Sequence, residues 1–407
     1  MSSVRVLRFA AVTAALGLVV AGCSSGGGGG SSASPSAAPS SAGGAVPQVS
    51  ATAFTADFAQ MSQLKDVASQ GKGLIGVLLP DTTTSTRYVQ YDAPYLKKAF
   101  QTAGLPDAMF KIDNANGSAS TMQTQAEADI NAGASVLLVD PLDSGSGAAI
   151  EAAARAAGVA VIDYDRLTLG GPADRYYVSF DNVKVGQTIG DGMVQCLTDW
   201  NVSKPNILIM DGDPTDNNAS LFAKGYNGVL DPMFTSGKYV KVGEPAGTWD
   251  PATAATTFEQ QLTAHPEMNA VVTPNDDNAN AVISILKGKG VKPKTFPTTG
   301  QDASLPGLQN ILTGYQCGTV YKPIYLEAQA AAALALYLRA GITPPASLVN
   351  ATTTDTQAKT DVKSVYTTPV WVTTSNMAST VVKDGAVTVD KLCAGDVSAA
   401  CKAAGIS

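Results

Sequence analysis

The chain has 407 residues, with 27 Lys and Arg, 34 Asp and Glu and a formal net charge of −7. This acidic balance excludes a broad basic surface, so we expect neither a nucleic-acid partner nor electrostatic adhesion to anionic lipid. The length is sufficient for two domains of ordinary size.

The N-terminus has the pattern of an export signal. Two arginines precede an apolar run at 9–20 (FAAVTAALGLVV), which is shorter than the ~20 residues that a membrane-spanning helix needs. Residues 20–23 (VAGC) resemble a bacterial lipobox, in which the cysteine thiol is lipidated and becomes the mature N-terminus. We therefore expect a signal peptide at 1–22 and a lipidated Cys23 that anchors the exported chain to the outer face of the cytoplasmic membrane.

A low-complexity segment follows this cysteine. Residues 24–50 contain almost no large apolar side chain, so they bury too little surface to offset the entropy lost on ordering the backbone. The first buried strand is expected only at 74–79. The sequence therefore predicts that the lipidated cysteine and a flexible Ser-, Gly-, Pro- and Ala-rich stalk together extend over 23–72.

From residue 73 onward, short apolar runs alternate with longer amphipathic segments. Such alternation indicates βαβ units and parallel sheets. In a first series we expect strands at 74–79, 110–112, 135–139, 159–164 and 176–180, with helices at 89–103, 119–132 and 144–157. In a second series we expect strands at 206–210, 239–242, 270–273 and 295–299, with helices at 183–198, from 217, at 251–264 and at 277–288. Two such series predict an α/β fold with two similar, doubly wound parallel-sheet lobes.

Four cysteines remain after Cys23, and an even number in an exported protein indicates two disulfides. Cys393 and Cys401 are close in the sequence, so we favour a bridge between them, with Cys196–Cys317 as the second bridge. Free buried thiols are the alternative.

Charged and amide side chains recur where the predicted strands end, which is where open parallel sheets bind their ligands. They include Asp165, Arg166, the segment DGDPTDNNASLF at 211–222, Asn275, Gln301, Asp302 and Lys322, with Arg87, Tyr88 and Trp249 just before helices. A single Asp or Asn at such a position commonly caps a helix. Capping does not explain why both charge signs and two aromatic residues occur together.

This mixture of side chains favours a neutral sugar as the ligand. Carboxylates accept hydrogen bonds from sugar hydroxyls, Arg, Lys and Asn donate to them, and the C–H faces of the ring pack on Trp249 and Tyr88. A phosphate or another anion would instead need mainly donors, whereas here at least three carboxylates accompany three cations.

Six short motifs occur in a fixed order along the chain. They are YDR (164–166), SFDN (179–182), DNNA-x-LF (216–222), NDDNA (275–279), GQDA (300–303) and VYKP (320–323). In this order the chain resembles, over about 73–340, the periplasmic xylose-binding proteins of ABC sugar importers, in the type I, ribose-binding-like group of solute-binding proteins. The resemblance implies two α/β lobes, a three-segment hinge and a pentose enclosed between the lobes.

The resemblance also implies which residues contact the sugar. These are Arg87, Tyr88, Asp165, Arg166, Asp216, Asn218, Trp249, Asn275, Asp302 and Lys322. Crossings between the lobes are expected near 181–183, 322–324 and 350–370, with Lys322 at the hinge. We expect the N-terminal lobe to comprise 73–181 and 323–350, and the C-terminal lobe to comprise 182–322 and 365–407.

The function that follows is extracytoplasmic binding of a monosaccharide, D-xylose, and its delivery to an ABC permease when the two lobes close around it. We expect a monomer with no catalytic residue, no cofactor and no metal. The alternatives are a sensor that signals to a membrane receptor and a carbohydrate-active enzyme. Ribose, arabinose, glucose and galactose remain alternative sugars.

Overall fold

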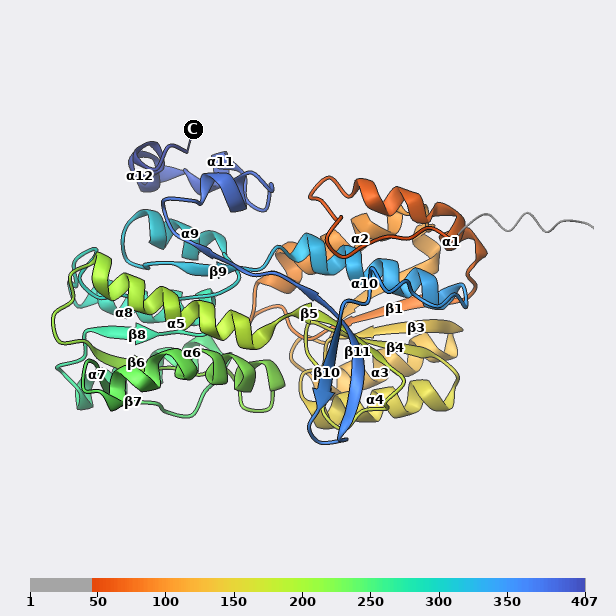
Figure 1. Ribbon diagram of the computed structural model, residues 1–407, viewed down its shortest axis with the longest axis horizontal. Coiled ribbons are helices and arrows are strands. Elements are labelled where there is room, and N and C mark those ends of the chain that lie inside the picture. Colours follow the sequence, from red (N-terminus) through yellow and green to blue (C-terminus); the bar gives the residue numbers. More distant parts are fainter. Residues whose placement is uncertain (1–45, 407) are drawn as a thin grey trace, which may run out of the picture. The chain divides into compact units, whose positions relative to one another are not determined.

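The computed structural model describes residues 46–406, and Figure 1 shows how their helices and strands are arranged. The expected signal peptide at 1–22, the lipidated Cys23 and the stalk up to residue 45 lie outside the described residues. In the described part of the chain, no helix is both long and apolar enough to cross a bilayer.

A seven-stranded sheet forms the centre of the first lobe, which comprises residues 46–180 and 324–367. Its spatial order is β10-β11-β5-β4-β3-β1-β2, and all neighbours are parallel except β10 and β11. The strands are β1 (Leu74–Leu79), β2 (Phe110–Asn114), β3 (Ala134–Val139), β4 (Ala160–Tyr164), β5 (Tyr176–Phe180), β10 (Ala351–Asp355) and β11 (Thr360–Thr367). The parallel core of this sheet matches the first predicted series of strands.

The second lobe, residues 182–321 and 370–406, contains a three-stranded parallel sheet in the order β7-β6-β8 and an antiparallel pair, β12-β9. The strands are β6 (Asn206–Ile209), β7 (Val240–Gly243), β8 (Ala270–Val272), β9 (Thr319–Tyr321) and β12 (Val370–Val372). Isolated bridges from Thr298 to Val271 and from Gln301 to Val320 lie between these two groups.

The strand expected at 295–299 is therefore reduced to a single bridge. Pro297 has no N–H to donate to a strand ladder. The hydroxyl of Thr299 accepts a hydrogen bond from the Thr273 N–H at 3.0 Å and donates to the Thr273 carbonyl at 3.1 Å. Side-chain bonds thus replace part of the backbone pairing that a regular strand would make.

Helices cover both faces of each sheet (Figure 1). In the first lobe they are η1 (Ala59–Leu64), α1 (Lys65–Gln70), η2 (Tyr88–Asp92), α2 (Ala93–Thr102), η3 (Asp107–Met109), α3 (Ala119–Asn131), α4 (Ser144–Ala156) and α10 (Ile324–Arg339). In the second lobe they are α5 (Asn182–Asp199), α6 (Asn217–Thr235), α7 (Pro251–Ala264), α8 (Asp276–Gly288), α9 (Leu305–Leu312), η4 (Ala378–Val382), α11 (Val389–Leu392), η5 (Gly395–Val397) and α12 (Ser398–Ala403). Many of these helices begin at a side-chain cap, as strand-to-helix turns require.

The strands bury side chains on both faces, with a period of two. In β1, Ile75, Val77 and Leu79 join a core with α10, whereas Leu78 joins a core with α3 and α4 on the other face. The strand sequences are therefore apolar throughout, as expected for a parallel sheet covered on both sides. The carboxyl ends of the strands are left to form the site.

Residues 46–72 belong to the first lobe and not to a stalk. Phe58, Met61 and Leu64 are fully buried in the core that also contains α10. The side-chain amide of Gln329 donates to the Thr55 carbonyl at 2.9 Å. The expectation that the stalk extends to residue 72 is wrong, because apolar side chains recur every three or four residues after residue 50 and form a buried face.

The chain crosses between the lobes three times, and these crossings confirm the predicted hinge. They follow β5, β9 and β11, at residues 181, 322–323 and 368–369. One predicted boundary is wrong: residues 351–367 belong to the first lobe, so the second segment of the C-terminal lobe begins after 367 and not at 365. The reason is that β11 pairs with β5 and extends the first sheet by a hairpin.

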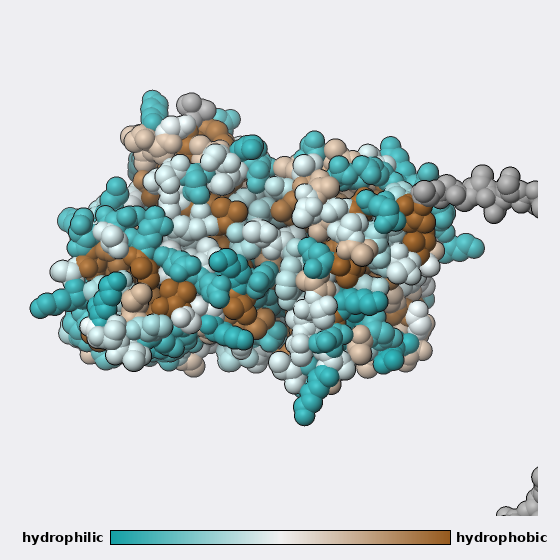
Figure 2. All heavy atoms as spheres, in the orientation of Figure 1, coloured by the Kyte–Doolittle hydropathy of each residue, from teal (hydrophilic) through white to brown (hydrophobic). Residues whose placement is uncertain are grey.

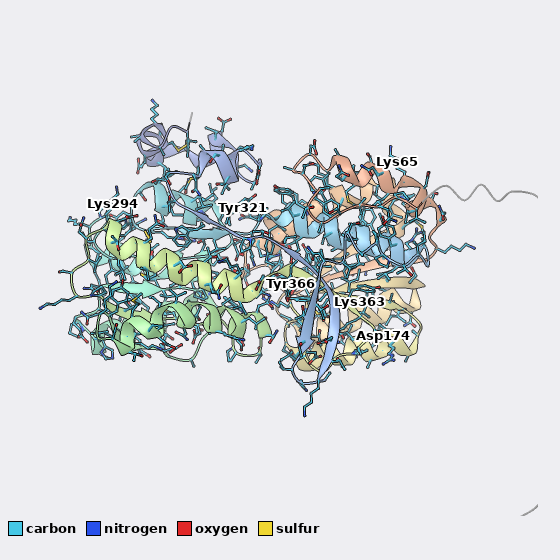
Figure 3. The ribbon with its side chains drawn as sticks, viewed as in Figure 1. Lys65, Asp174, Lys294, Tyr321, Lys363 and Tyr366 are labelled. Carbon is cyan, nitrogen blue, oxygen red and sulfur yellow. A yellow bond between two sulfur atoms is a disulfide. The ribbon has the colours of Figure 1, made fainter. Side chains whose placement is uncertain are left out.

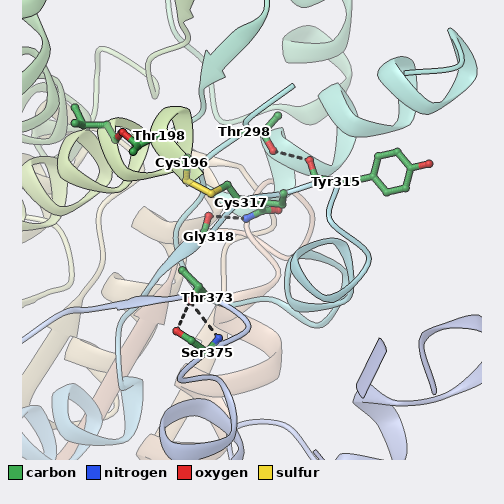
Figure 4. Close-up of a disulfide and its surroundings, with 10 residues drawn as sticks. Cys196, Thr198, Thr298, Tyr315, Cys317, Gly318, Thr373 and Ser375 are labelled. Carbon is green, nitrogen blue, oxygen red and sulfur yellow. Dashed lines mark hydrogen bonds between the residues drawn. A yellow bond between two sulfur atoms is a disulfide. The ribbon is translucent and has the colours of Figure 1, made fainter. Parts of the chain in front are cut away.

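Two disulfides lie in the second lobe, and their pairs are the ones that the sequence favoured. Cys196 in α5 is bonded to Cys317 just before β9, and Cys393 is bonded to Cys401 near the C-terminus. Figure 4 shows the first bridge, beside the hydrogen bond from the Thr298 hydroxyl to the Tyr315 carbonyl. This bridge closes a separation of 121 residues, so by restricting the unfolded chain it stabilises the fold by about 4–5 kcal/mol.

Few large apolar side chains are exposed on the described residues. They are Val46, Val89 and Val240. Figure 2 accordingly shows apolar surface on the visible face only as separate areas between hydrophilic ones.

Helices α5 and α6 pack closely, and glycines make this possible. A Cβ atom at Gly225 would overlap the backbone of Val183 and Gln187, whereas a Cβ atom at Gly228, also in α6, would meet no atom within 4 Å. The contact matters for the site because α5 begins at the hinge and α6 carries two residues of the cavity described below.

We predict opposite effects for two matched substitutions in α6. Gly225→Ala should lower the free energy of unfolding by about 1–3 kcal/mol, because the added methyl group forces the two helices apart. Gly228→Ala should raise it by up to about 1 kcal/mol, because alanine favours the helix. Urea unfolding of both variants is the measurement, and equal effects would contradict close packing at Gly225.

Candidate functional site

A cavity lies between the lobes, at the carboxyl ends of their strands. All ten residues assigned from the sequence line it: Arg87, Tyr88, Asp165, Arg166, Asp216, Asn218, Trp249, Asn275, Asp302 and Lys322. Three more residues, Ser85, Phe222 and Gln301, complete the lining. The structure thus brings together side chains that are up to 237 positions apart in the chain, from Ser85 to Lys322.

The topology explains why these residues meet. In the first lobe, Arg87 and Tyr88 follow β1, and Asp165 and Arg166 follow β4. In the second lobe the lining residues stand at the start of α6, before α7, before α8 and before α9, and Lys322 lies on the crossing that leads from β9 to α10. Parallel strands direct all of these turns to one edge of their sheet.

One aspartate in each lobe turns the chain sharply at the end of the sheet. Asp165 and Asp302 have φ angles of 60° and 89°, in the left-handed region that Asp tolerates better than most residues. Each still donates its backbone N–H to a neighbouring strand, to Val178 and Val320 respectively, at 2.9 Å. The two lobes therefore present a carboxylate to the cavity by the same local device.

Arg87 is buried and is surrounded by carboxylates. Its guanidinium contacts Asp165 Oδ1 at 2.9 Å, Asp92 Oδ1 at 2.7 Å and Glu327 Oε2 at 2.9 Å. Burial raises the pKa of Glu327 well above its ordinary value, although Arg87 opposes this change. Arg87 is thus the positive centre around which the first-lobe half of the site is arranged.

Asp165 remains ionised in this environment. Burial alone would raise its pKa, but the positive charges of Arg87, Lys322 and Arg166 outweigh burial and hold the pKa well below the ordinary value. The Tyr88 hydroxyl also donates to Asp165 Oδ2 at 3.1 Å. Asp165 is therefore a permanent hydrogen-bond acceptor at the cavity wall.

An ion pair between Arg166 and Asp216 joins the two lobes directly. Arg166 Nε of the first lobe lies 3.1 Å from Asp216 Oδ2 of the second lobe, and the Trp249 indole N–H donates to the same oxygen at 3.1 Å. Asp216 Oδ1 caps α6 by accepting the Asn218 N–H at 2.8 Å. Burial raises the pKa of Asp216, and Arg166 counteracts this rise. Asp216 thus both caps α6 and lines the cavity.

Trp249 is held in a fixed orientation at the cavity. Its indole ring packs directly against Gly212, where a Cβ atom would overlap the ring. The ring also meets Phe222 edge-to-face, with 6.4 Å between the ring centroids. Together with the indole hydrogen bond, these contacts present a rigid aromatic surface to the lining.

Lys322 connects carboxylates of both lobes at the hinge. Its Nζ lies 3.2 Å from Asp302 Oδ1 and 3.7 Å from Asp165 Oδ1. The carboxylates belong to the second and the first lobe respectively. A change in the angle between the lobes would alter at least one of these distances.

Further hydrogen bonds hold the lobes in contact in this conformation. Asn218 Nδ2 donates to the Asp165 carbonyl at 2.9 Å, and Asn182 Nδ2 donates to the Tyr177 hydroxyl at 2.9 Å. At the outer part of the site, the Thr86 N–H donates to Asp277 Oδ2 at 3.0 Å. The described conformation is therefore a closed one.

The charges in the lining balance. Three carboxylates, Asp165, Asp216 and Asp302, face three cations, Arg87, Arg166 and Lys322. A ligand with a net charge would disturb this balance, whereas a neutral ligand rich in hydroxyls fits it. Among residues 46–406, no group of three or more His, Cys, Asp or Glu is arranged to hold a metal ion.

Sequence reasoning did not assign Ser85, Phe222 or Gln301 to the site, nor Asp92 and Glu327 behind Arg87. Phe222 and Gln301 lie inside two of the six motifs, DNNA-x-LF (216–222) and GQDA (300–303), so the sequence did contain a signal for them. Glu327 is the single acidic residue of the mostly apolar helix α10, and a lone acidic residue there is a usable signal for a buried ion pair. Ser85 lies in a Thr-rich loop that gives no such indication.

Comparison with known proteins identifies the group to which this chain is related. Residues 75–342 match the family described as "Periplasmic binding protein domain". The chain belongs to the periplasmic binding protein family. Among curated relatives of this periplasmic binding protein, the D-xylose-binding periplasmic protein of Escherichia coli (strain K12) is 36% identical over 325 residues, which is 79% of this chain and 93% of the relative.

Two other relatives have names that do not specify xylose. The multiple sugar-binding periplasmic receptor ChvE of Rhizobium radiobacter is 32% identical over 336 residues, covering 79% of this chain and 92% of the relative. A crystal structure of a carbohydrate transporter solute binding protein from Chloroflexus aurantiacus, in complex with D-glucose, matches with a TM-score of 0.70 and 28% identity. That match covers 79% of this chain and 98% of the solved chain.

We predict that the buried charge of Arg87 is essential to the stability of this periplasmic binding protein. Arg87→Met should lower the free energy of unfolding by about 3–5 kcal/mol, because it leaves buried carboxylates without their cation. The control is Arg155→Met, which removes an exposed ion pair with Asp174 at 3.5 Å and should change stability by less than about 0.5 kcal/mol. Urea unfolding at pH 7 measures both, and a small effect at Arg87 would refute the assigned role.

Proposed function

We propose that this periplasmic binding protein binds one neutral monosaccharide, D-xylose, in the cavity between its lobes and delivers it to the permease of an ABC-type sugar importer. The observation that carries the proposal is the charge-balanced lining, with three carboxylates, three cations and the rings of Tyr88, Phe222 and Trp249. Sugar hydroxyls both donate and accept, so they use both kinds of charged group. The C–H face of the ring packs on the aromatic side chains.

The lining comes from both lobes, so a ligand gains its full set of contacts only when the lobes are closed. Binding therefore shifts the population toward the closed conformation, in proportion to the difference in affinity between the two states. The permease then recognises the closed shape.

The choice of sugar rests on relatives. Proteins named for D-xylose are 36% and 34% identical to this chain, and proteins named for multiple sugars are 32% and 31% identical. The solved relative with D-glucose is 28% identical. Xylose is therefore the first choice, and glucose is the main competitor.

We also propose that the chain is exported, monomeric and anchored to the membrane by a lipid on Cys23. The support is the export signal and lipobox pattern at 1–23, together with relatives named as periplasmic. Two disulfides suit an oxidising compartment outside the cytoplasm.

The decisive experiment is calorimetry of the purified chain with D-xylose, D-ribose, L-arabinose, D-glucose and D-galactose. We expect saturable binding of one mole of D-xylose per mole of chain, with weaker heats for the other sugars. Sugar recovered afterwards should be chemically unchanged. Tighter binding of another sugar would change the assignment within the class, and no binding of any, or conversion to a product, would refute the proposal.

We predict that Trp249 supplies a large part of the binding energy. Trp249→Ala should raise the Kd for the bound sugar by about 10- to 100-fold, because it removes the apolar face that covers the ring. Trp200→Ala is the matched control, since Trp200 ends α5 outside the lining and its loss should leave the Kd unchanged. Equal effects of the two substitutions would contradict the assigned position of the sugar.

A further inference from the structure

The C-terminal segment, defined here as residues 373–406, is an addition to the second lobe. Its buried side chains, among them Met377, Val381 and Leu392, form one apolar cluster with α9 and with Tyr321 of β9. The disulfide Cys393–Cys401 closes the end of this segment. The segment therefore moves with the second lobe.

One carboxylate of this segment contacts both sides of the hinge. Asp384 Oδ2 accepts the Tyr321 hydroxyl at 3.3 Å and the Tyr325 hydroxyl at 3.2 Å. Tyr321, labelled in Figure 3, is in the core of the second lobe, whereas Tyr325 begins α10 and packs against the core of the first lobe. Lys322 of the sugar cavity lies between these two tyrosines in the chain.

A second contact of the segment also reaches the first lobe. Ala386 lies in an apolar cluster with Tyr91 and Tyr95 of the first lobe. The same three residues surround a narrow gap together with Tyr321, Lys322 and Ile324. Lys322 thus borders both this gap and the sugar cavity.

The chemistry of the contact favours a stable link. Burial raises the pKa of both Tyr321 and Tyr325, so both hydroxyls keep their protons and act as donors. Both hydroxyls donate to the same carboxylate oxygen, Asp384 Oδ2, so this one atom is bonded to a residue on each side of the hinge. Because Asp384 moves with the second lobe and Tyr325 with the first, a rotation at the hinge would break one bond.

We propose that the C-terminal segment is a hinge clasp: Asp384, bound to Tyr321 and Tyr325, favours the closed conformation and positions Lys322 between the two lobes. Asp384 is a positioning residue, since it does not line the cavity. The effect on sugar affinity rests on the proposed function. A purely structural role, in which the segment only protects the second lobe, would affect unfolding and leave affinity unchanged.

The test compares Asp384→Ala, Tyr325→Phe and the double variant with wild type, and uses Asp396→Ala as the control. Asp396 is an exposed aspartate of the same segment, without a hydrogen bond to the hinge. For the sugar that wild type binds, Asp384→Ala should raise the Kd about tenfold and Tyr325→Phe about threefold or more. The double variant should be no weaker than Asp384→Ala, because both substitutions remove the same link. Asp396→Ala should bind as wild type does.

A second measurement does not depend on sugar. Hydrogen exchange of backbone amides at 321–326 in the unliganded chain should be faster in Asp384→Ala than in Asp396→Ala. Any one of three results would overturn the proposed clasp. They are an unchanged Kd in Asp384→Ala, additive effects on the Kd in the double variant, and equal exchange rates in Asp384→Ala and Asp396→Ala. If wild type binds none of the sugars, the proposed function fails, and the exchange comparison alone decides whether the clasp exists.

Discussion

The structure depends on the compensation of buried charge at the carboxyl ends of its strands. Arg87, Arg166 and Lys322 are each almost excluded from water, and each lies against at least one carboxylate. An isolated charge at this depth would cost several kcal/mol, so none of these groups is tolerable without its partners. The partners of Arg166 and Lys322 come from both lobes. Closing the lobes therefore completes an electrostatic arrangement as well as a cavity.

This arrangement makes the lining both polar and rigid. Asp165 is fixed by Arg87 and Tyr88, and Asp216 is fixed by Arg166 and Trp249. Hydrogen-bonding groups that are already oriented lose little conformational freedom when a ligand arrives. The same residues that keep the fold intact thus prepare the surface on which a ligand is recognised.

The sequence was sufficient for the parts of the fold that follow local rules. Apolar strands and capped helices identified the alternating pattern, and the strand-end rule led to residues such as Asp302. It was not sufficient where distant packing decides: residues 46–72 join the first lobe because α10, some 270 positions later, offers them an apolar face. The β10–β11 hairpin is a similar case, because its place beside β5 depends on a pairing between distant segments. Glu327 was overlooked because its role is defined only by Arg87, 240 positions away.

The bridge between Cys196 and Cys317 has a mechanical consequence. It joins α5, which starts at the first crossing, to Cys317, which lies two residues before β9, the strand that ends at the second crossing. Two of the three crossings are thereby coupled by a covalent bond within the second lobe. A displacement at one crossing is therefore transmitted to the other through the second lobe, and this lobe rotates as one rigid body.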